Sequence, residues 1–181
     1  MSNTDVSTDN EVIERSADEP GAFALLFDRH APVIYRYAAQ RLGEGSAEDV
    51  MSETFLVAFE KRAAYDLAIV DARPWLFGIA TRLMHKHVRL EARAWKGMVA
   101  DLAAQLSPDM IEQAGARLDA ARLTRRLASA LRGLPASDRD TLLLYAWGDL
   151  DYAGIARALD VPIGTVRSRL NRARRILRTA A

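Results

Sequence analysis

The sequence predicts an all-α protein in which two small helical domains are joined by a flexible linker. Apolar residues recur at spacings of three and four along most of the 181 residues, as on the buried face of a helix. Alternating apolar and polar stretches bounded by turn residues, the pattern of strands, are missing. Hydrophobic residues make up 50% of the chain, which is enough to build compact cores. We expect a disordered acidic leader at residues 1–20, a first helical domain at 21–96, a linker at 97–120 and a second helical domain at 121–181.

The beginning of the chain is acidic and polar. Residues 1–20 carry six acidic side chains against the single Arg15 and few apolar ones, which predicts a disordered leader that ends near Pro20. They lack the basic start and apolar centre of a signal peptide, and the chain contains no apolar run of 18 residues. The protein is therefore expected in the cytoplasm, without membrane insertion.

The composition disfavours several kinds of chemistry. The chain has no cysteine, which rules out disulfides, thiolate catalysis and cysteine-ligated metal sites. Its three histidines are scattered, so we expect neither a metal site nor a cofactor. The patterns G-x-x-x-x-G-K-[ST], G-x-S-x-G and H-E-x-x-H are also missing. These observations argue against an enzyme.

The first domain contains three helical segments. Residues 22–42 carry an apolar face, with a bend expected near Pro32, whose ring removes a backbone donor. Gly43 breaks the pattern, and Ser46 is the expected N-cap of the second helix. A third segment begins near Pro74. Two charged clusters follow one another along these helices, an acidic one (Glu44, Glu48, Asp49, Glu53) and a basic one (Arg82, Lys86, Arg89, Arg93, Lys96).

The linker and the start of the second domain are marked by breaker residues. Residues 97–118 contain two glycines, a Ser-Pro break and few aromatic residues, which is the composition of a linker. A helical pattern resumes at Leu123, turns near Gly133 and continues in a second helix that Gly148 ends.

Residues 151–178 have the pattern of a helix-turn-helix. Asp151 caps a short helix, residues 160–162 form the turn, and a longer helix follows. Four apolar residues of the longer helix, at spacings of four, three and four, share the side that packs on the first helix: Val166, Leu170, Ala173 and Leu177.

The opposite face of the longer helix predicts contact with DNA. Residues 161–181 contain six arginines and no acid, whereas an ordinary solvated face mixes both signs. Arginine bridges guanine and asparagine bridges adenine with paired hydrogen bonds in the major groove, while further arginines hold phosphates. The face comprises Gly164, Arg167, Ser168, Asn171, Arg172 and Arg175.

These motifs resemble a known family. The run LPASDRDTLLLYAWGDLDYAGIARALDVPIGTVRSRLNRARR, from Leu134 to Arg175, closely resembles region 4 of extracytoplasmic-function (ECF) sigma factors. Upstream, FALLFDRHAPVIYRYAAQRLG, AEDVMSETFLVAFEKR and RPWLFGIATRLMHKHVR resemble successive parts of region 2 in the same order. The similar segments cover most of residues 22–178, and the short linker fits the two-domain type of sigma factor.

The resemblance implies an alternative sigma factor that directs promoter-specific transcription initiation. In that family region 2 binds the clamp helices of the largest subunit of core RNA polymerase and captures melted bases of the minus-10 element. Region 4 docks near the polymerase flap and reads the duplex minus-35 element. Family members are commonly held inactive by an anti-sigma factor, so we expect such a partner in addition to core polymerase and promoter DNA.

The resemblance also implies three sets of contact residues. The minus-35 set is Gly164, Thr165, Arg167, Ser168, Asn171, Arg172 and Arg175, with Arg175 acting chiefly on phosphate. The minus-10 set is Arg82, His85, Lys86, His87 and Arg89. The polymerase-binding set is Asp49, Glu53 and Phe55, although Phe55 also fits a place in the core.

The sequence departs from the family pattern at a few positions. Arg82 and Lys86 stand where relatives often have asparagine and aspartate, which leaves the base preference at the minus-10 element open. Asp160 replaces a common glycine in the turn, where we expect it to tolerate the left-handed conformation.

Two other functions compete with that of a sigma factor. A helix-turn-helix regulator would bind a palindromic operator as a dimer without touching polymerase, and it would leave the similarity to region 2 unexplained. An adaptor that sequesters another factor would not need the arginine face.

Overall fold

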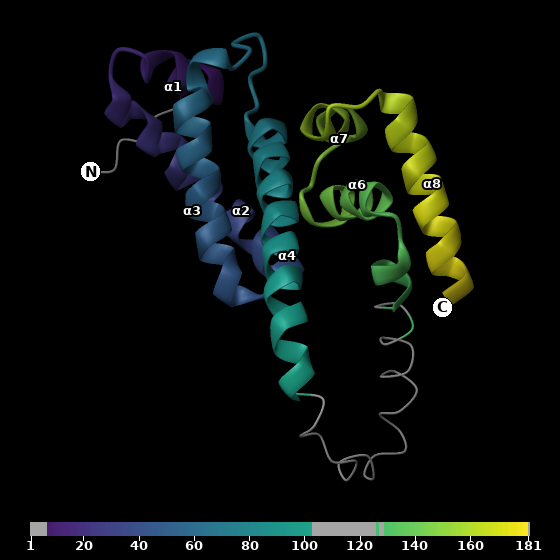
Figure 1. Cartoon of the computed structure of the whole chain (residues 1–181). Helices are drawn as coiled ribbons and strands as arrows, with labels where there is room; N and C mark the ends of the chain where they lie inside the picture. Colours follow the sequence, from purple (N-terminus) through teal and green to yellow (C-terminus); the bar gives the residue numbers. More distant parts are fainter. Residues whose placement is uncertain (1–6, 103–125, 127–128, 181) are drawn as a thin grey trace, which may run out of the picture.

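The computed structural model of the chain describes residues 7–102, 126 and 129–180, and the side chains of these residues except 89–102 and 180. Every regular element in this part of the chain is a helix, so the all-α prediction is confirmed (Figure 1). The elements in chain order are α1 (Asp9–Arg15), the 3-10 turn η1 (Pro20–Phe23), α2 (Ala24–Leu42), α3 (Glu44–Lys61), the 3-10 turn η2 (Arg62–Ala64), α4 (Arg73–Leu102), α6 (Ala136–Trp147), α7 (Tyr152–Leu159) and α8 (Ile163–Ala180).

Helices α1 to α4 form an N-terminal unit in which α2, α3 and α4 pack on one another. Tyr37 of α2 and Phe77 of α4 meet edge to face at its centre, with their ring centroids 5.0 Å apart. Helix α2 continues through the exposed Pro32. Helix α3 begins at Glu44, two residues before the predicted cap Ser46, after Gly43 has ended α2 with a φ of 85°.

The predicted disorder of the leader is wrong for residues 7–20, because α1 packs on the N-terminal unit. Val12 and Ile13 are buried, with exposed fractions of 0% and 2%. The Thr8 backbone N–H donates to the Glu11 carboxylate at 2.7 Å, as in a capping box. A local cap and two buried apolar side chains therefore order a segment whose composition is otherwise that of a disordered one.

A buried carboxylate ties α1 to the rest of the unit. Asp9 accepts hydrogen bonds from His30 at 2.8 Å, Arg29 at 3.2 Å and the Ala72 backbone N–H at 3.0 Å.

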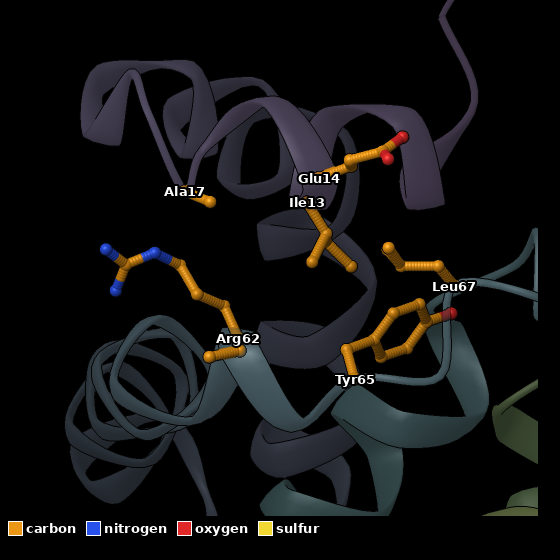
Figure 2. Close-up of a pocket in the computed structure, with 7 residues that line it drawn as sticks. Ile13, Glu14, Ala17, Arg62, Tyr65 and Leu67 are labelled. Carbon is orange, nitrogen blue, oxygen red and sulfur yellow. The ribbon is translucent and has the colours of Figure 1, made fainter.

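A cavity of about 400 Å³ lies between the end of α1, the turn η2 and the loop that follows η2. Figure 2 shows Ile13 pointing from α1 towards Tyr65 in this cavity.

Helices α6, α7 and α8 form a C-terminal unit with the helix-turn-helix arrangement that the sequence predicts. Val166, Leu170 and Ala173 of α8 have exposed fractions of 0% and Leu177 is half-buried, so the predicted inner face of this helix is confirmed. They pack on α6 and α7, where Leu144 and Ile155 are also fully buried.

The two units are in direct contact along α4. Figure 1 shows α4 in the middle of the molecule, with α3 on one side and α6 and α7 on the other, and α8 on the side of α7 that faces away from α4. Helix α4 extends to Leu102, so residues 97–102 of the predicted linker are helical. The remainder of the predicted linker, residues 103–120, lies outside the described residues.

Candidate nucleic-acid and polymerase interfaces

The outer face of α8 presents most of the predicted minus-35 residues to solvent. Residues at spacings of three, four, seven and eleven along a helix lie within about one third of its circumference. Thr165 is only partly exposed and lies at the edge of the face. The exposed residues on this arc are Gly164, Arg167, Ser168, Asn171 and Arg175, and Arg172, also exposed, lies at its edge.

The turn before α8 sets the direction of this face. The Asp151 carboxylate accepts a hydrogen bond from the Gly154 backbone N–H at 2.6 Å, so the predicted cap of α7 is confirmed. Asp160 ends α7 in the left-handed conformation, with φ 53° and ψ 54°, as expected for this aspartate. Both features are local, and the sequence predicted them correctly because each depends on neighbouring residues alone.

Arg172 differs from the other predicted minus-35 residues. Its guanidinium donates two hydrogen bonds to the Asp138 carboxylate of α6, one of them from Nη2 at 2.7 Å. Asp138 has an exposed fraction of 0%, and the hydrogen bonds from Arg172 hold its pKa below the usual value although burial opposes this shift. Arg172 therefore joins α8 to α6, and two of its three guanidinium nitrogens are engaged inside the C-terminal unit.

Other arginines of α8 extend its positive surface beyond the predicted set. The Arg174 guanidinium lies over the ring of Tyr145, 5.2 Å from its centroid. Tyr145 is 43% exposed and meets Tyr152 edge to face. The six arginines between residues 161 and 181 already indicate a long positive surface. The contact of Arg174 with an aromatic ring could not be predicted in this way, because it depends on the packing of α6 against α8.

The predicted minus-10 residues on α4 lie in different surroundings from one another. Arg82 and Lys86 are exposed. The Nε2 atom of His85 lies 2.8 Å from Oδ2 of Asp140 in the C-terminal unit, although the two are not aligned as a hydrogen bond. His87 is half-buried, and the side chain of Arg89 lies outside the described residues.

The predicted polymerase-binding and minus-10 residues come together at Glu53. The Glu53 carboxylate on α3 receives a hydrogen bond from Lys86 at 3.2 Å and lies 3.5 Å from Nε2 of His87, both on α4. The two predicted surfaces are thus adjacent and share an ion pair. Asp49 is exposed one turn before Glu53.

Phe55 is buried and does not belong to the surface of α3. Its exposed fraction is 5%, and its ring packs edge to face on Phe27 of α2 at 4.9 Å between centroids. Two large apolar side chains are instead exposed here: Phe27 by 39% and Leu56 by 57%. Leu56 follows Asp49 by seven residues and so shares its face of α3. Exposed apolar side chains with polar residues around them are a feature of protein interaction sites.

The structure also limits other functions within the residues that it describes. These residues include no group of three or more His, Cys, Asp or Glu side chains that could hold a metal ion. No described helix is both long and apolar enough to cross a membrane. A cavity of about 480 Å³ lies between the two units, lined by Tyr65 and Trp75 from one and by Arg157 and Asp160 from the other.

Comparison with known proteins identifies the two units. Residues 26–94 match the profile of Sigma-70 region 2, and residues 124–177 match that of Sigma-70, region 4. The ECF RNA polymerase sigma factor SigL of Mycobacterium tuberculosis strain H37Rv is 31% identical over 167 residues, which cover 90% of each chain. The ECF sigma factor SigE of Mycolicibacterium smegmatis is 30% identical over 98% of this chain and 74% of its own length.

Solved structures show the same fold. CnrH, in complex with the cytosolic domain of CnrY, aligns with a TM-score of 0.66 and 24% identity over 94% of this chain and 95% of its own. The sigma factor RpoE of Bartonella quintana, in complex with the anti-sigma factor NepR, aligns with a TM-score of 0.60 and 22% identity over 87% and 95% of the two chains. The chain therefore belongs to the ECF sigma factors of the sigma-70 family, DNA-binding proteins that direct RNA polymerase to specific promoters and catalyse no reaction themselves.

Proposed function

We propose that this sigma factor reads the duplex minus-35 element with the outer face of α8. The observation that carries this proposal is the exposed arc of Arg167, Ser168, Asn171 and Arg175 on a helix without any acid. An α-helix fits the major groove, where Arg167 can pair with guanine and Asn171 with adenine. Arg175 lies at the far end of the arc and contacts phosphate.

Helix α4 holds the melted minus-10 strand in this proposal. Arg82 and Lys86 are exposed cations one turn apart, which is a spacing suited to the backbone of single-stranded DNA. His85, His87 and Arg89 belong to the same proposed set. Lys86 and His87 must leave Glu53 to engage the strand, so docking and strand capture are electrostatically linked.

Helix α3 docks on the clamp helices of core polymerase, and the C-terminal unit docks near the flap. The docking surface on α3 consists of Asp49, Glu53 and Leu56, and Phe27 of α2 adjoins it. Leu56 supplies desolvated apolar contact, whereas the acids steer the approach of a basic partner. Phe55 contributes indirectly, because its buried ring packs against the ring of Phe27.

An anti-sigma factor is the proposed regulator, and the cytoplasm the proposed site of action. The structure of RpoE was solved with its anti-sigma factor and that of CnrH with the cytosolic domain of CnrY. A protein that covers α3 and α8 of this chain would prevent both polymerase docking and promoter recognition.

Run-off transcription tests the proposed promoter recognition. Core RNA polymerase would be given a library of promoter sequences with and without this protein, and the start sites would be sequenced. We expect new initiation at sites that share two upstream elements at a fixed separation. If core polymerase remains silent while the protein alone shifts a palindromic duplex, the promoter assignment is wrong.

A pair of variants tests the docking surface on α3. Leu56→Ala removes an exposed apolar contact and should weaken binding to core polymerase by about 1 to 2 kcal/mol, the effect typical of an important interface residue. Ser52→Ala, at an exposed position of the same helix, is the control. Binding would be measured by fluorescence anisotropy, and equal affinities for the two variants would contradict the assignment.

A further inference from the structure

Helix α8 begins with an exposed apolar side chain. Ile163 is the first residue of this helix and has an exposed fraction of 42%. It is not among the half-buried apolar residues of the described chain that pack against the core. In the described part of the C-terminal unit the other exposed large apolar side chain is Tyr145, which is in contact with the ring of Tyr152. Packing within the described chain therefore gives Ile163 no role.

The turn before α8 holds Ile163 in a fixed place. The carbonyl of Pro162 accepts a hydrogen bond from the backbone N–H of Thr165 at 2.9 Å, which starts the helix. The backbone N–H of Val161 donates to the carbonyl of Ala156 at 3.0 Å, and the Val161 side chain packs against the core. A side chain on such a fixed backbone loses little freedom when it meets a partner, so a contact made by Ile163 costs little ordering.

Gly164 leaves the surface beside Ile163 open. A Cβ atom built on Gly164 would meet nothing within 4 Å, and the residue has no positive φ. Glycine is also a poorer helix former than alanine. The described fold therefore does not require a glycine here, whereas a close approach of the backbone to a ligand does favour one.

Both residues lie where a helix-turn-helix meets the bases. In this motif the N-terminal residues of the second helix contact base edges, while the first helix crosses the DNA backbone. Arg167 follows Ile163 by four residues, so their Cβ atoms are about 5 to 6 Å apart on one side of α8. Neighbouring base pairs are about 3.4 Å apart. Ile163 thus reaches a base one or two positions from the base that Arg167 contacts.

The chemistry of an isoleucine side chain selects one of the four bases. The apolar group that a base pair presents in the major groove is the C5-methyl group of thymine, whereas the other edges are hydrogen-bond donors and acceptors. Contact between this methyl group and isoleucine removes apolar surface from water. Contact with a polar edge would desolvate that edge without offering it a hydrogen bond, which is unfavourable.

We infer that Ile163, with Gly164 beside it, reads the C5-methyl group of a thymine in the minus-35 element. This thymine lies one or two positions from the guanine that pairs with Arg167. The contact adds an apolar determinant of specificity to the hydrogen bonds of Arg167 and Asn171. The inference rests on the proposed docking of α8 in the major groove.

Replacement of thymine by uracil tests the methyl contact, because uracil keeps the base pair and lacks only the C5-methyl group. Each thymine of the minus-35 element, in either strand, would be replaced in turn in promoters obtained by run-off transcription. Binding of the holoenzyme to these duplexes would be measured by fluorescence anisotropy. We expect one replacement to weaken the parent complex about fourfold, the effect of about one buried methyl group. Ile163→Ala should bind the unmodified promoter at least as weakly and should not be weakened further by that replacement.

Two further variants serve as controls for Ile163→Ala. Ile176→Ala makes the same chemical change on α8 at a half-buried position turned about 140° around the helix from Ile163. It should bind the thymine and uracil promoters as the parent does. Ile163→Val retains a branched apolar side chain and should remain sensitive to the loss of the methyl group.

Gly164→Ala separates recognition from stability. The added methyl group would meet nothing within 4 Å and favours the helix, so Tm should not fall. Promoter affinity should nevertheless fall severalfold, because the methyl group occupies the space through which the bases approach. Unchanged promoter affinity would overturn the close approach at Gly164.

The uracil series also shows how the inference can fail. Equal losses in the parent and in Ile163→Ala at every position would overturn it, and so would a parent that tolerates uracil at every position. Weaker binding of Ile163→Ala to core polymerase in the absence of DNA would assign Ile163 to a protein interface instead. A failure of the proposed docking of α8 is distinguishable, because replacing whole base pairs of the minus-35 element would then leave the parent affinity unchanged.

Discussion

The two units hold their charged side chains in opposite ways. In the N-terminal unit cations are paired with acids from other elements, as Lys86 and His87 are with Glu53 across α3 and α4. In the C-terminal unit the outer face of α8 exposes Arg167 and Arg175 to solvent with no acid on the same helix. The difference teaches that α8 presents these cations without an acid on its own helix, whereas Lys86 and His87 of α4 would have to leave Glu53 before they could bind an external anion.

Arg172 differs from Arg167 and Arg175 because its guanidinium is paired with an acid of another helix. It lies on the edge of the same helix, but its pairing with the buried Asp138 makes it part of the scaffold. Neighbouring arginines of one helix therefore have separate tasks, and substitutions can tell these tasks apart.

The largest effect is expected at Arg167. Arg167→Ala removes a paired contact to a base and should weaken promoter complexes by about 1 to 3 kcal/mol, with loss of preference at one position of the minus-35 element. Arg167→Lys retains the positive charge but not the planar pair of N–H donors, so it should also lose the preference for one base. Binding of the holoenzyme to promoters that vary at each minus-35 position measures the affinity and the base preference of each variant. Full discrimination by the lysine variant would mean that Arg167 contacts phosphate only.

A comparable effect, on stability and not on recognition, is expected at Asp138. Asp138→Asn weakens two charge-assisted hydrogen bonds at a fully buried site and should destabilise the C-terminal unit by about 2 kcal/mol. For a chain of this length that lowers Tm by about 4 to 8 °C. Thermal unfolding by circular dichroism measures the change, with Asp28→Asn at an exposed site as the control. Arg172→Ala should lower Tm in the same direction and, combined with Asp138→Asn, should add less than the sum.

A smaller and uniform effect is expected at Arg175. Arg175→Ala should weaken all promoters alike and reduce the slope of log affinity against log salt by about 1, because one phosphate contact is lost. Arg175→Lys should restore most of the affinity, since lysine serves phosphate as a point charge. Titrations at several salt concentrations provide the slope. A loss confined to particular base sequences would contradict the phosphate assignment.

The pairing within the N-terminal unit predicts an acid-dependent loss of stability. Burial raises the pKa of Asp9, but hydrogen bonds from His30, the Ala72 backbone N–H and Arg29 outweigh it, and the net pKa lies below the usual 3.8. A carboxyl whose pKa is lower in the folded state stabilises the protein above pH 3.8, and this contribution disappears as the pH falls through the folded-state pKa. Asp9→Asn should therefore give a Tm that depends less on pH below this value, as measured by thermal unfolding between neutral and acidic pH. Identical pH profiles for the two proteins would show that Asp9 does not contribute.

The smallest effect is expected at Glu53. Glu53→Gln weakens the internal pairing of Lys86 and His87, so affinity for a single-stranded minus-10 oligonucleotide should rise about twofold, in line with the small energies of exposed ion pairs. Glu60→Gln changes an exposed acid seven residues further along α3 and serves as the control. Fluorescence anisotropy with a labelled oligonucleotide measures both. Equal gains in the two variants would indicate a general charge effect only.

Much of the fold and part of the candidate site were predictable from sequence. The cap at Asp151, the turn at Asp160 and the buried stripe of Val166 and Leu170 follow from local spacing and local conformational preference. The order of α1 was missed because composition predicts disorder unless a tertiary contact is present. Its signal was readable in Thr8 and Glu11, a capping box directly before the two apolar residues that become buried.

The exposure of apolar residues was not predictable in the same way. Phe27 and Leu56 have helical spacing that suits a core, and only the packing of α2 on α3 leaves them at the surface beside Asp49. Phe55, adjacent in sequence to Leu56, turns inward instead. A helix with apolar residues on more than one side does not indicate by itself which side a neighbouring helix will cover.

The sequence by itself determined which residues share the outer face of α8, because the period of an α-helix places them there whatever surrounds the helix. Only the tertiary structure decided which charged groups remain available on that face and on α4. Arg172 meets Asp138, and His85 meets Asp140, through residues that are far apart in sequence and are brought together by helix packing. The energy of such pairs depends on distance and burial, and both are properties of the folded chain.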